Sequence, residues 1–519
     1  MTSFDCIVIG AGHNGMAAST ILSKSGRKVL LIEASSGPGG MGKTIEGFDG
    51  LSMVNTLNHL NSEVINELEL TKFGLEQDHH FLKTICLEEN KEKLIFEGSY
   101  GSNVLGIDNS ELQSWLKLRK RLFLQSSILK KFINSIPIQE DITAKEKLNL
   151  AFSAINLRLK GKDEFQEFFR MILMCIADIA EEFLSNDLLK GLLSYDATLG
   201  VKLGPRSPTS LIGLLYRLSG DINGKQGVQV FPKGGMHNLI QCFFKSLTKA
   251  GVSSKFNEIV KEIIIENGRA VGVKTSNGKE YQSKTILSAI SPIVTFKNLV
   301  GYPNLDTGFV RAINSSRYEG NTSKLLLSLN KVPEITGIKT DLLGSRFIYA
   351  PSIEIVEEGF NPSKYNKVSE NPTFEFIIPS CIDPSLTPKD TVLVSITIQN
   401  TPYMTNESWG KNKLLLQKAV INKIEKFSPG FSKTIIKSNF LTPLEIEKDY
   451  FVPGGHWHHS ELQIDRMYSL RPVFGFANYQ SPIENLYICG AGTHPGGGIS
   501  GSSGLNAARK ILNDQKGEI

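Results

Sequence analysis

Residues 4–15 read Phe-Asp-Cys-Ile-Val-Ile-Gly-Ala-Gly-His-Asn-Gly, an apolar strand that runs directly into three regularly spaced glycines. Gly10 permits a tight turn, Gly12 lets the backbone approach phosphate groups, and Gly15 lets a helix pack closely on the strand. Free N–H groups at the positive end of such a helix bind anions. The stretch therefore predicts a nucleotide diphosphate site at the head of a β-α-β unit.

The residues that follow complete this unit. The predicted helix over 14–25 ends at Gly26, and a second apolar strand, Val29–Ile32, leads to Glu33. A carboxylate about twenty residues beyond the glycines is placed to accept hydrogen bonds from an adenosine ribose. A β-α-β unit without a nucleotide is the less favoured interpretation.

A second glycine-rich stretch, residues 36–44 (Ser-Gly-Pro-Gly-Gly-Met-Gly-Lys-Thr), comes directly after this carboxylate. Together the two stretches resemble the FAD site of the large flavoprotein oxidoreductase family. Paired glycines in that family, here Gly39 and Gly40, approach the phosphate and ribityl side of the cofactor. Gly-Pro-Gly-Gly is also good turn chemistry, so a flexible surface turn is the alternative.

Size and composition limit the class of protein. A chain of 519 residues predicts two or three domains rather than one simple core. A net charge of +5 lacks the concentrated basic surface of a nucleic-acid-binding protein, so we expect no nucleic acid partner. The six cysteines include no Cys-x-x-Cys pair, which disfavours a disulfide framework, a cysteine zinc site and a dithiol redox centre.

The same features bear on location. The first strand begins about four residues from Met1, so we expect no leader peptide and a cytoplasmic protein. We find no apolar run of about 18 residues, the length needed to span a membrane. Residues 115–124 (Trp-Leu-Lys-Leu-Arg-Lys-Arg-Leu-Phe-Leu) are basic and amphipathic. They are typical either of a solvated helix face, which we favour, or of peripheral contact with a membrane surface.

The predicted fold class is α/β, with a discontinuous nucleotide-binding part. Residues 257–280 alternate between apolar runs and Asn-Gly turns, which predicts a β-meander, and residues 165–183 predict a buried helix. We assign a Rossmann-like FAD-binding domain to residues 1–70, 226–300 and 471–519. An inserted α+β substrate domain, with a helical region and a mixed or antiparallel sheet, takes residues 71–225 and 301–470.

The most specific segment is residues 485–509, where an apolar strand precedes Cys-Gly-Ala-Gly-Thr-His-Pro-Gly-Gly-Gly and a helix start rich in small residues. No bulky side chain intervenes before Leu505, so the backbone itself can lie against a flat ring such as a flavin. A helix starting near Ser500 would direct its positive end at the pyrimidine side of that ring, where negative charge gathers on reduction.

Five segments resemble the phytoene-desaturase-like flavoproteins, and within them the branch of pyridine nucleotide-disulfide oxidoreductase domain-containing protein 2. These segments are residues 10–15, 68–75, 232–236, 467–472 and 489–498. The resemblance implies non-covalent FAD and hydride removal from, or redox-neutral isomerisation of, a hydrophobic, polyene or lipid-like substrate. Oxygen or a quinone would be the electron acceptor. Met41 replaces the arginine that many carotenoid desaturases carry after the paired glycines, so the substrate itself is not implied.

The resemblance also implies which residues hold the cofactor, with Val260 contacting the adenine through its backbone. The expected FAD-binding residues are Gly10, Gly12, His13, Asn14, Gly15, Glu33, Ala34, Gly39, Gly40, Met41, Thr44, Val260, Gly490, Gly492, Thr493, Gly497, Gly498, Ile499 and Ser500. The candidate catalytic residues are His494, Arg471 and His459. His494 either bonds the flavin or substrate or packs beneath the glycine loop, and Arg471 either faces the pocket or pairs with a buried carboxylate.

Residues 454–461 (Gly-Gly-His-Trp-His-His-Ser-Glu) hold three histidines in four residues. No second ligand cluster accompanies them, so we favour a cavity wall over a metal site. We expect an apolar cavity between this segment and the loop 490–498. Two further hypotheses stay open: an amine-oxidase-like flavoenzyme, and a non-catalytic protein that uses FAD only to stabilise its fold.

Overall fold

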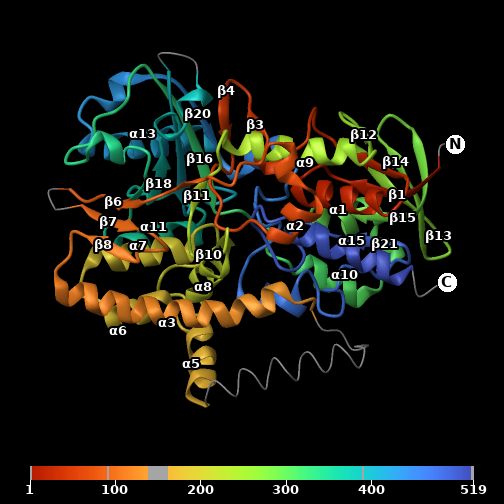
Figure 1. Ribbon diagram of the computed structural model, residues 1–519, viewed down its shortest axis with the longest axis horizontal. Helices are drawn as coiled ribbons and strands as arrows, with labels where there is room; N and C mark the ends of the chain where they lie inside the picture. The colour runs from red at the N-terminus through yellow and green to blue at the C-terminus, as the bar shows by residue number, and fades with distance from the viewer. Residues whose placement is uncertain (1–2, 90–92, 138–161, 388–390, 516–519) are drawn as a thin grey trace.

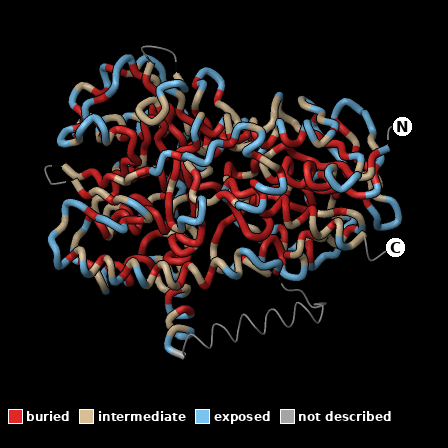
Figure 2. The backbone as a smooth tube through the Cα atoms, in the orientation of Figure 1, coloured by how far each residue is buried: buried red, intermediate tan, exposed pale blue. Residues whose placement is uncertain are grey.

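The computed structural model describes residues 3–89, 93–137, 162–387 and 391–515. Two large β-sheets lie toward opposite ends of the long axis, and a group of helices lies beside the second sheet (Figure 1). Buried backbone is found in both halves and across the region between them (Figure 2). The two halves therefore share an interior rather than standing apart.

The first sheet is built on parallel strands. β1 (Ser3–Ile9) pairs with β2 (Val29–Ile32) on one side and with β15 (Glu280–Ser288) on the other, and β12 (Ser253–Lys255) pairs with β2. All of β2 and most of β1 are buried, as expected for parallel strands covered on both faces. The helices α1 (His13–Lys24), α9 (Gly235–Lys249) and α15 (Ser502–Asp514) pack on one face of this sheet.

β15 divides its outer edge between two partners. Residues 280–282 pair antiparallel with β14 (Arg269–Thr275), and residues 286–288 pair in parallel with β21 (Leu486–Ile488). β14 pairs in turn with β13 (Val260–Glu266), which gives the meander predicted from the Asn-Gly turns. Strands from the beginning, middle and end of the sequence therefore meet in one sheet.

The second sheet has eight strands in the order β20-β16-β19-β18-β17-β6-β7-β8. It is mixed, because β6 and β17 are parallel whereas the other neighbours are antiparallel. The strands are β20 (Ile435–Leu441), β16 (Thr322–Leu329), β19 (Val392–Gln399), β18 (Phe374–Ile377), β17 (Arg346–Tyr349), β6 (Thr84–Cys86), β7 (Leu94–Glu97) and β8 (Asn103–Leu105).

Alternate residues of β16 face opposite sides of this sheet. Leu325 and Leu327 pack with α13 (Trp409–Phe427), whereas Leu326 packs on the other face, in a cluster with Phe48 and Leu51. Because side chains alternate along a strand, Lys324 projects to the same face as Leu326, away from α13. The face of the second sheet opposite α13 thus carries a buried lysine.

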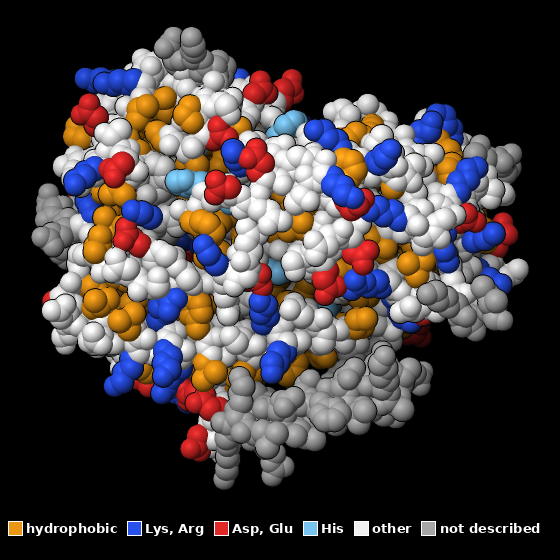
Figure 3. Space-filling model, in the orientation of Figure 1, with side chains coloured by type: hydrophobic (Ala, Val, Ile, Leu, Met, Phe, Trp, Pro, Cys, Tyr) orange, Lys and Arg blue, Asp and Glu red, His pale blue; other side chains and the backbone are white. Residues whose placement is uncertain are grey.

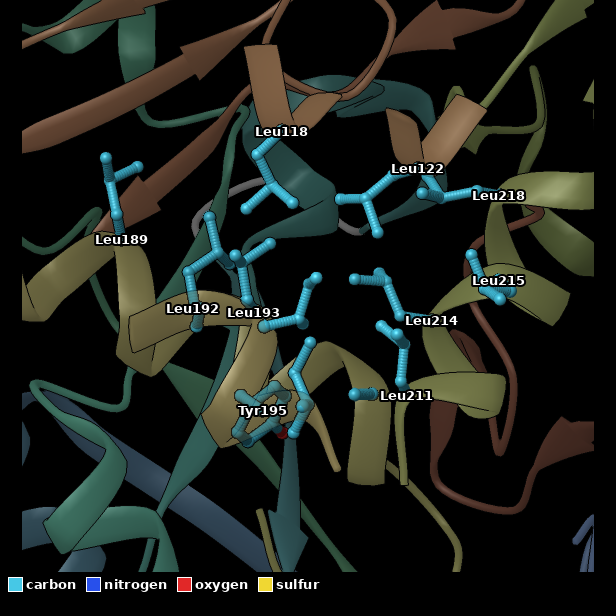
Figure 4. Packing of buried hydrophobic residues seen from close by; sticks show 14 of the residues in the cluster. Leu118, Leu122, Leu189, Leu192, Leu193, Tyr195, Leu211, Leu214, Leu215 and Leu218 are labelled. Atoms are coloured by element: carbon cyan, nitrogen blue, oxygen red, sulfur yellow. The ribbon is translucent and has the colours of Figure 1, made fainter. Parts of the chain in front are cut away.

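Leucine-rich helices form a separate core beside the second sheet. Leu118 and Leu122 point toward leucines of two other helices in Figure 4. These helices are α3 (Asn109–Asn134), α6 (Ile176–Phe183), α7 (Asp187–Thr198) and α8 (Leu211–Ser219). The basic segment 115–124 is part of α3, and the Arg121 guanidinium lies 2.9 Å from the Glu167 carboxylate.

The single buried helix predicted over 165–183 is wrong: the structure has α5 (Lys162–Leu173) and then α6. The break lies at Cys175, whose backbone is extended and whose Sγ accepts a hydrogen bond from the Asp178 N–H at 3.3 Å. α5 buries Phe168 and Met171 but exposes residues 165, 169 and 173. The apolar residues of this segment are therefore divided between two helices, each of which buries a different face.

The remaining elements are shorter. They are α2 (Ser62–Glu67), α10 (Thr307–Asn314), α11 (Ile353–Phe360), α12 (Pro379–Ile382) and α14 (Pro443–Tyr450), with the pairs β3 (Thr44–Ile45) and β4 (Phe48–Ser52), β5 (His80–Phe81) and β11 (Val230–Phe231), and β9 (Asp221–Ile222) and β10 (Lys225–Gln226). None of the described helices is long and apolar enough to cross a membrane. On the face shown in Figure 3, basic and acidic side chains are interspersed.

The origin of the strands supports a division into two domains. The first sheet takes its strands from residues 3–32, 253–288 and 486–488, and the second from residues 84–105 and 322–441. We propose the domain boundaries stated above on this basis. β6, β7 and β8 lie in the part of the chain for which the sequence predicted a helical region, so the second sheet extends further than expected.

Candidate functional site

The first glycine stretch folds as a tight turn before α1. Gly10 has φ +99°, and a Cβ at Gly15 would lie 2.0 Å from the Gly10 carbonyl oxygen, so only glycine lets α1 pack this closely. A Cβ at Gly12 would meet nothing within 4 Å, since this position faces a cavity. Asn14 accepts a hydrogen bond from the Gly504 N–H at 3.3 Å, which joins the starts of α1 and α15.

Glu33 lies directly after β2 and faces the same cavity. Its Oε2 accepts from the Ala11 N–H at 2.6 Å and its Oε1 from the Ser35 N–H at 2.8 Å. The Glu258 N–H donates to the Glu33 carbonyl at 3.0 Å, which brings the segment before Val260 against this strand end. We call this part of the cavity the proximal end; it is lined by Glu33, Ala34, Ser35, Glu258 and Val260.

The second glycine stretch lies on the first. The Gly39 N–H donates to the Ala11 carbonyl at 2.9 Å, and a Cβ at Gly40 would lie 3.4 Å from the Gly12 Cα. Gly39, Gly40 and Met41 line the cavity, whereas Thr44 is not part of the lining and its Oγ1 lies 3.1 Å from His237 Nδ1. This stretch is therefore a wall of the site.

The loop after β21 forms a third wall. The Gly490 N–H donates to Ser503 Oγ at 2.9 Å, which ties the loop to the first turn of α15. Gly492 and Thr493 lie behind the surface, where a Cβ at Gly492 would be 2.3 Å from Pro292. The loop residues that line the cavity are Gly490, Ala491, Pro495, Gly497, Gly498, Ile499 and Ser500.

One continuous cavity of about 470 Å³ connects these three segments to the second sheet. Its opposite part, which we call the distal end, is lined by the charged side chains Asp196, Arg217, Lys324 and Glu375 together with Thr397. The segments 457–462 and 490–498 both contribute to the wall, as expected. The wall is not uniformly apolar, because strand register brings charged residues of the second sheet to the distal end.

The part of the cavity that runs from the proximal end to the loop after β21 fits a dinucleotide. It offers an open position at Gly12, the start of α1 and an acceptor carboxylate at Glu33. It also carries buried imidazole nitrogens without a partner among the described residues, on His13, His458 and His459. Burial lowers the pKa of His13 to about 4 and that of His459 to about 3, so both rings are neutral near pH 7. A neutral imidazole can donate or accept a hydrogen bond.

The two other candidate catalytic residues lie behind the cavity wall. His494 Nε2 lies 2.8 Å from the Ile133 carbonyl oxygen, and burial lowers the pKa of this ring to about 4. This placement favours the packing alternative. The Arg471 guanidinium is fully buried and donates to the carbonyls of Ala491, Glu461, Arg466 and His458 rather than to a carboxylate. It thereby ties the segment 458–466 to the loop after β21.

The histidines of residues 456–459 do not form a metal centre in the described part of the chain. There, no three His, Cys, Asp or Glu side chains converge as a metal ion requires. His456 Nε2 instead lies 3.6 Å from the buried Glu461 carboxylate. The segment serves as a wall, with Trp457, His458 and His459 in the lining.

The distal charged residues were not identified as site residues from the sequence. Asp196 lies on α7, Arg217 on α8, and Lys324, Thr397 and Glu375 on three neighbouring strands. The one sequence signal is a lysine directly before the leucine-rich stretch 325–329, in a strand where charged residues are seldom buried. Tyr216 was missed too; its OH donates to the Gly497 carbonyl at 2.8 Å and links α8 to the loop.

The fold and the site define an FAD-binding, two-domain oxidoreductase, and the comparisons agree. Residues 15–366 match the family model of flavin-containing amine oxidoreductases. Pyridine nucleotide-disulfide oxidoreductase domain-containing protein 2 of Rattus norvegicus is 28% identical over 99% of this chain and 94% of its own length. Prolycopene isomerase of Daucus carota is 24% identical over 98% of this chain and 80% of its own length. A solved putrescine oxidase variant has a TM-score of 0.62 at 12% identity, with both chains fully covered.

The chain belongs to the flavin-containing amine oxidoreductase family, because the family model matches more than half of its length. Its cofactor is FAD, as the two N-terminal glycine stretches and the C-terminal loop predicted. The hypothesis of a phytoene-desaturase-like flavoenzyme is confirmed at the level of an FAD-dependent oxidoreductase with desaturase and isomerase relatives.

Proposed function

We propose that this oxidoreductase acts on a carbon–carbon bond of a largely apolar, polyene or lipid-like substrate, either by desaturating it or by isomerising a double bond. The prolycopene isomerase relative, which aligns with 98% of the chain, supports such a substrate. The apolar part of the distal wall supports it too, with Leu57, Leu199, Val201 and Leu462 in the lining. These side chains would hold a hydrocarbon and exclude water.

The residues of the cavity wall would bind the cofactor and position the substrate. Bound FAD would supply the acceptor for a hydride, which is two electrons and one proton. Glu33 would hold the ribose, and the glycine stretches would take the diphosphate at the start of α1. His459 and the start of α15 would lie toward the ring, and Trp457 with Leu462 would orient the substrate.

The charged residues of the distal end argue against an amine substrate. Both carboxylates there already accept hydrogen bonds from other side chains. Glu375 accepts one from Arg346 at 2.6 Å. Asp196 accepts one from Arg346 at 2.6 Å and one from Tyr100 at 2.9 Å. Arg217 and Lys324 add two more cations. Three cations against two anions give a net charge of +1, which repels an alkylammonium group.

Anaerobic titration of the FAD-loaded protein tests this proposal. We expect a polyene or a lipid extract either to bleach the flavin absorbance or to leave as a different double-bond isomer, as analysed by chromatography. Putrescine and benzylamine should leave the flavin oxidised. Rapid bleaching by either amine, without any change in the polyene, would replace this proposal by the amine-oxidase-like function.

We further propose that FAD is held without a covalent bond and that oxygen or a quinone re-oxidises it. Cys489, the cysteine nearest the flavin-facing loop in sequence, packs in the core of the first domain with Cys6 and Leu505, away from the cavity lining. Acid precipitation should therefore release the flavin into the supernatant. A flavin that stays with the pellet would show a covalent link.

A further inference from the structure

Lys324 is the most unusual side chain of the distal end. It lies on β16, between the edge strand β20 and β19 of the second sheet, is 6% exposed, and lines the cavity. Its Nζ donates to Thr397 Oγ1 at 3.0 Å. An ammonium group has three N–H donors, and no second acceptor contacts it among the described residues. Two donors therefore remain for a ligand in the cavity.

The neighbouring carboxylates offset the charge of Lys324 only in part: the charge of Glu375 raises the pKa of Lys324, against the larger effect of burial. Strand register places Lys324 beside Thr397, and Thr397 beside Glu375, in one row across β16, β19 and β18. Arg346 donates hydrogen bonds to the carboxylates of Glu375 and Asp196. Asp196 lies 3.4 Å from Arg217 as well. The two acids are thus shared among three cations, and one positive charge is left over.

Such a charge is costly to keep in a buried cavity. An ammonium group removed from water without a counter-ion loses several kcal/mol of hydration, and buried charges in proteins are normally paired. Burial lowers the pKa of Lys324 to about 8, a value at which most of the side chain is still protonated near pH 7. The arrangement lacks one anion, and the cavity is where that anion can enter.

We propose that the distal end binds the carboxylate of an amphiphilic substrate, with Lys324 as the principal donor and Arg217 as the second cation. This inference rests on the proposed function and names its substrate class: an apolar chain or ring system with one acidic group. A single excess positive charge matches a monoanionic carboxylate better than a dianionic phosphate. The apolar wall formed by Leu57, Leu199 and Val201 would hold the hydrocarbon part.

The experiment uses the FAD-loaded protein and three probes with the same chain: decanoate, decan-1-ol and decyl phosphate. Binding is followed by calorimetry and by tryptophan fluorescence, since Trp457 lines the cavity. We expect decanoate to bind at least about tenfold more tightly than decan-1-ol, because a hydrogen bond between two charged groups is stronger than one to a neutral hydroxyl. Equal affinity of the two probes, or tighter binding of decyl phosphate, would overturn the inference.

Substitutions test whether the preference for decanoate over decan-1-ol depends on Lys324. In Lys324→Met the advantage of decanoate over decan-1-ol should disappear, and in Lys324→Arg most of it should remain. Lys331→Met is the matched control, because Lys331 is exposed just beyond the end of β16, and it should behave as the wild type. A full carboxylate preference in Lys324→Met would contradict the assignment. The wild-type comparison stands even if this variant does not fold.

Thermal unfolding separates a binding role from a structural one. If Lys324 is kept for a ligand, Lys324→Met should unfold at the same or a higher temperature, since it removes an unpaired buried charge. A large drop in the unfolding midpoint would assign Lys324 to strand pairing through Thr397 instead. A protein that binds no FAD would contradict the proposed function, whereas a flavoenzyme that ignores the carboxylate would overturn this inference alone.

Discussion

The three glycines near the N-terminus have different physical tasks. Gly15 is required by packing, because its hydrogen lies against the Gly10 carbonyl. Gly12 is required by access, because it borders open cavity and its backbone has φ −67°, which any residue can adopt. We therefore expect glycine to serve the fold at position 15 and the binding of the cofactor at position 12.

Two alanine substitutions should separate these tasks. Gly12→Ala should leave the unfolding midpoint of the FAD-free protein unchanged and weaken FAD binding by at least about tenfold, because a methyl group would enter the diphosphate space. Gly15→Ala should destabilise the FAD-free protein by about 1–3 kcal/mol or more through overpacking. Chemical denaturation and FAD titration measure both. Equal effects of the two changes on stability would contradict the distinction.

Buried histidines give the protein a pH dependence of stability. The pKa values of His13 and His494 are lowered to about 4 and that of His459 to about 3, whereas an unfolded histidine titrates near 6.5. The unfolded chain therefore binds more protons than the folded chain below pH 6.5. Stability is fully present above pH 6.5 and is lost as the pH falls toward 4, on the order of 3 kcal/mol for a shift of this size.

Unfolding midpoints between pH 7.5 and 4.5 measure this dependence. His494→Gln should flatten the decline, because it removes one titrating ring. A midpoint that stays constant down to pH 4.5 would show that these rings are protonated in the folded protein.

Among the elements, the loop after β21 depends on side chains that come from elsewhere. Arg471 holds the Ala491 carbonyl, and Tyr216 of α8 holds the Gly497 carbonyl. The loop itself is rich in glycine and has few side chains of its own to fix its position. Its shape is set by the 458–471 segment and by the helical layer.

Arg471→Met should therefore destabilise the protein by about 3 kcal/mol or more, since each buried carbonyl left without a donor costs about 1–3 kcal/mol. FAD should also bind more weakly, because the loop loses its anchor. Arg509→Met is the control: Arg509 is on the surface of α15 and pairs with Glu63 and Glu67, a contribution of about 0–1 kcal/mol. Similar denaturation curves for the two variants would contradict the anchoring role.

The sequence predicted correctly those secondary-structure elements that are determined by features a few residues long. The first β-α-β unit and the meander follow from glycine spacing, apolar runs and Asn-Gly turns, all of which act over a few residues. The prediction failed at residues 165–183, where Cys175 ends one helix and caps the next, a detail that periodicity does not show. It also missed strands β6, β7 and β8, which are three or four residues long and gain stability only from their partners in the sheet.

For the whole molecule, the sequence predicted the discontinuous FAD-binding part because each segment carries its own glycine signal. The distal charged row could not be predicted in this way. Lys324, Thr397 and Glu375 are separated by tens of residues and become neighbours only through the register of three strands. Their chemistry is a property of the assembled sheet.

The whole molecule also bears on the source of electrons. The described residues contain one strand, glycine turn and helix unit of the dinucleotide type, and we propose that FAD binds there. NADH and NADPH should therefore reduce the flavin slowly or not at all. Stopped-flow absorbance without oxygen measures this, with dithionite as the positive control. Bleaching by either nucleotide within seconds would contradict the prediction.

The divided edge of β15 has a consequence for how the protein is made. On the ribosome, residues 3–288 emerge early enough to assemble most of the first sheet, but half of the edge of β15 waits for residues 486–488. The loop 490–500 and the start of α15, which close the cavity, emerge later still. The nascent chain thus lacks this wall of the cavity until residues 490–502 have been made. Until residues 486–488 have been made, the outer edge of residues 286–288 has no partner strand and is exposed to pairing with other chains.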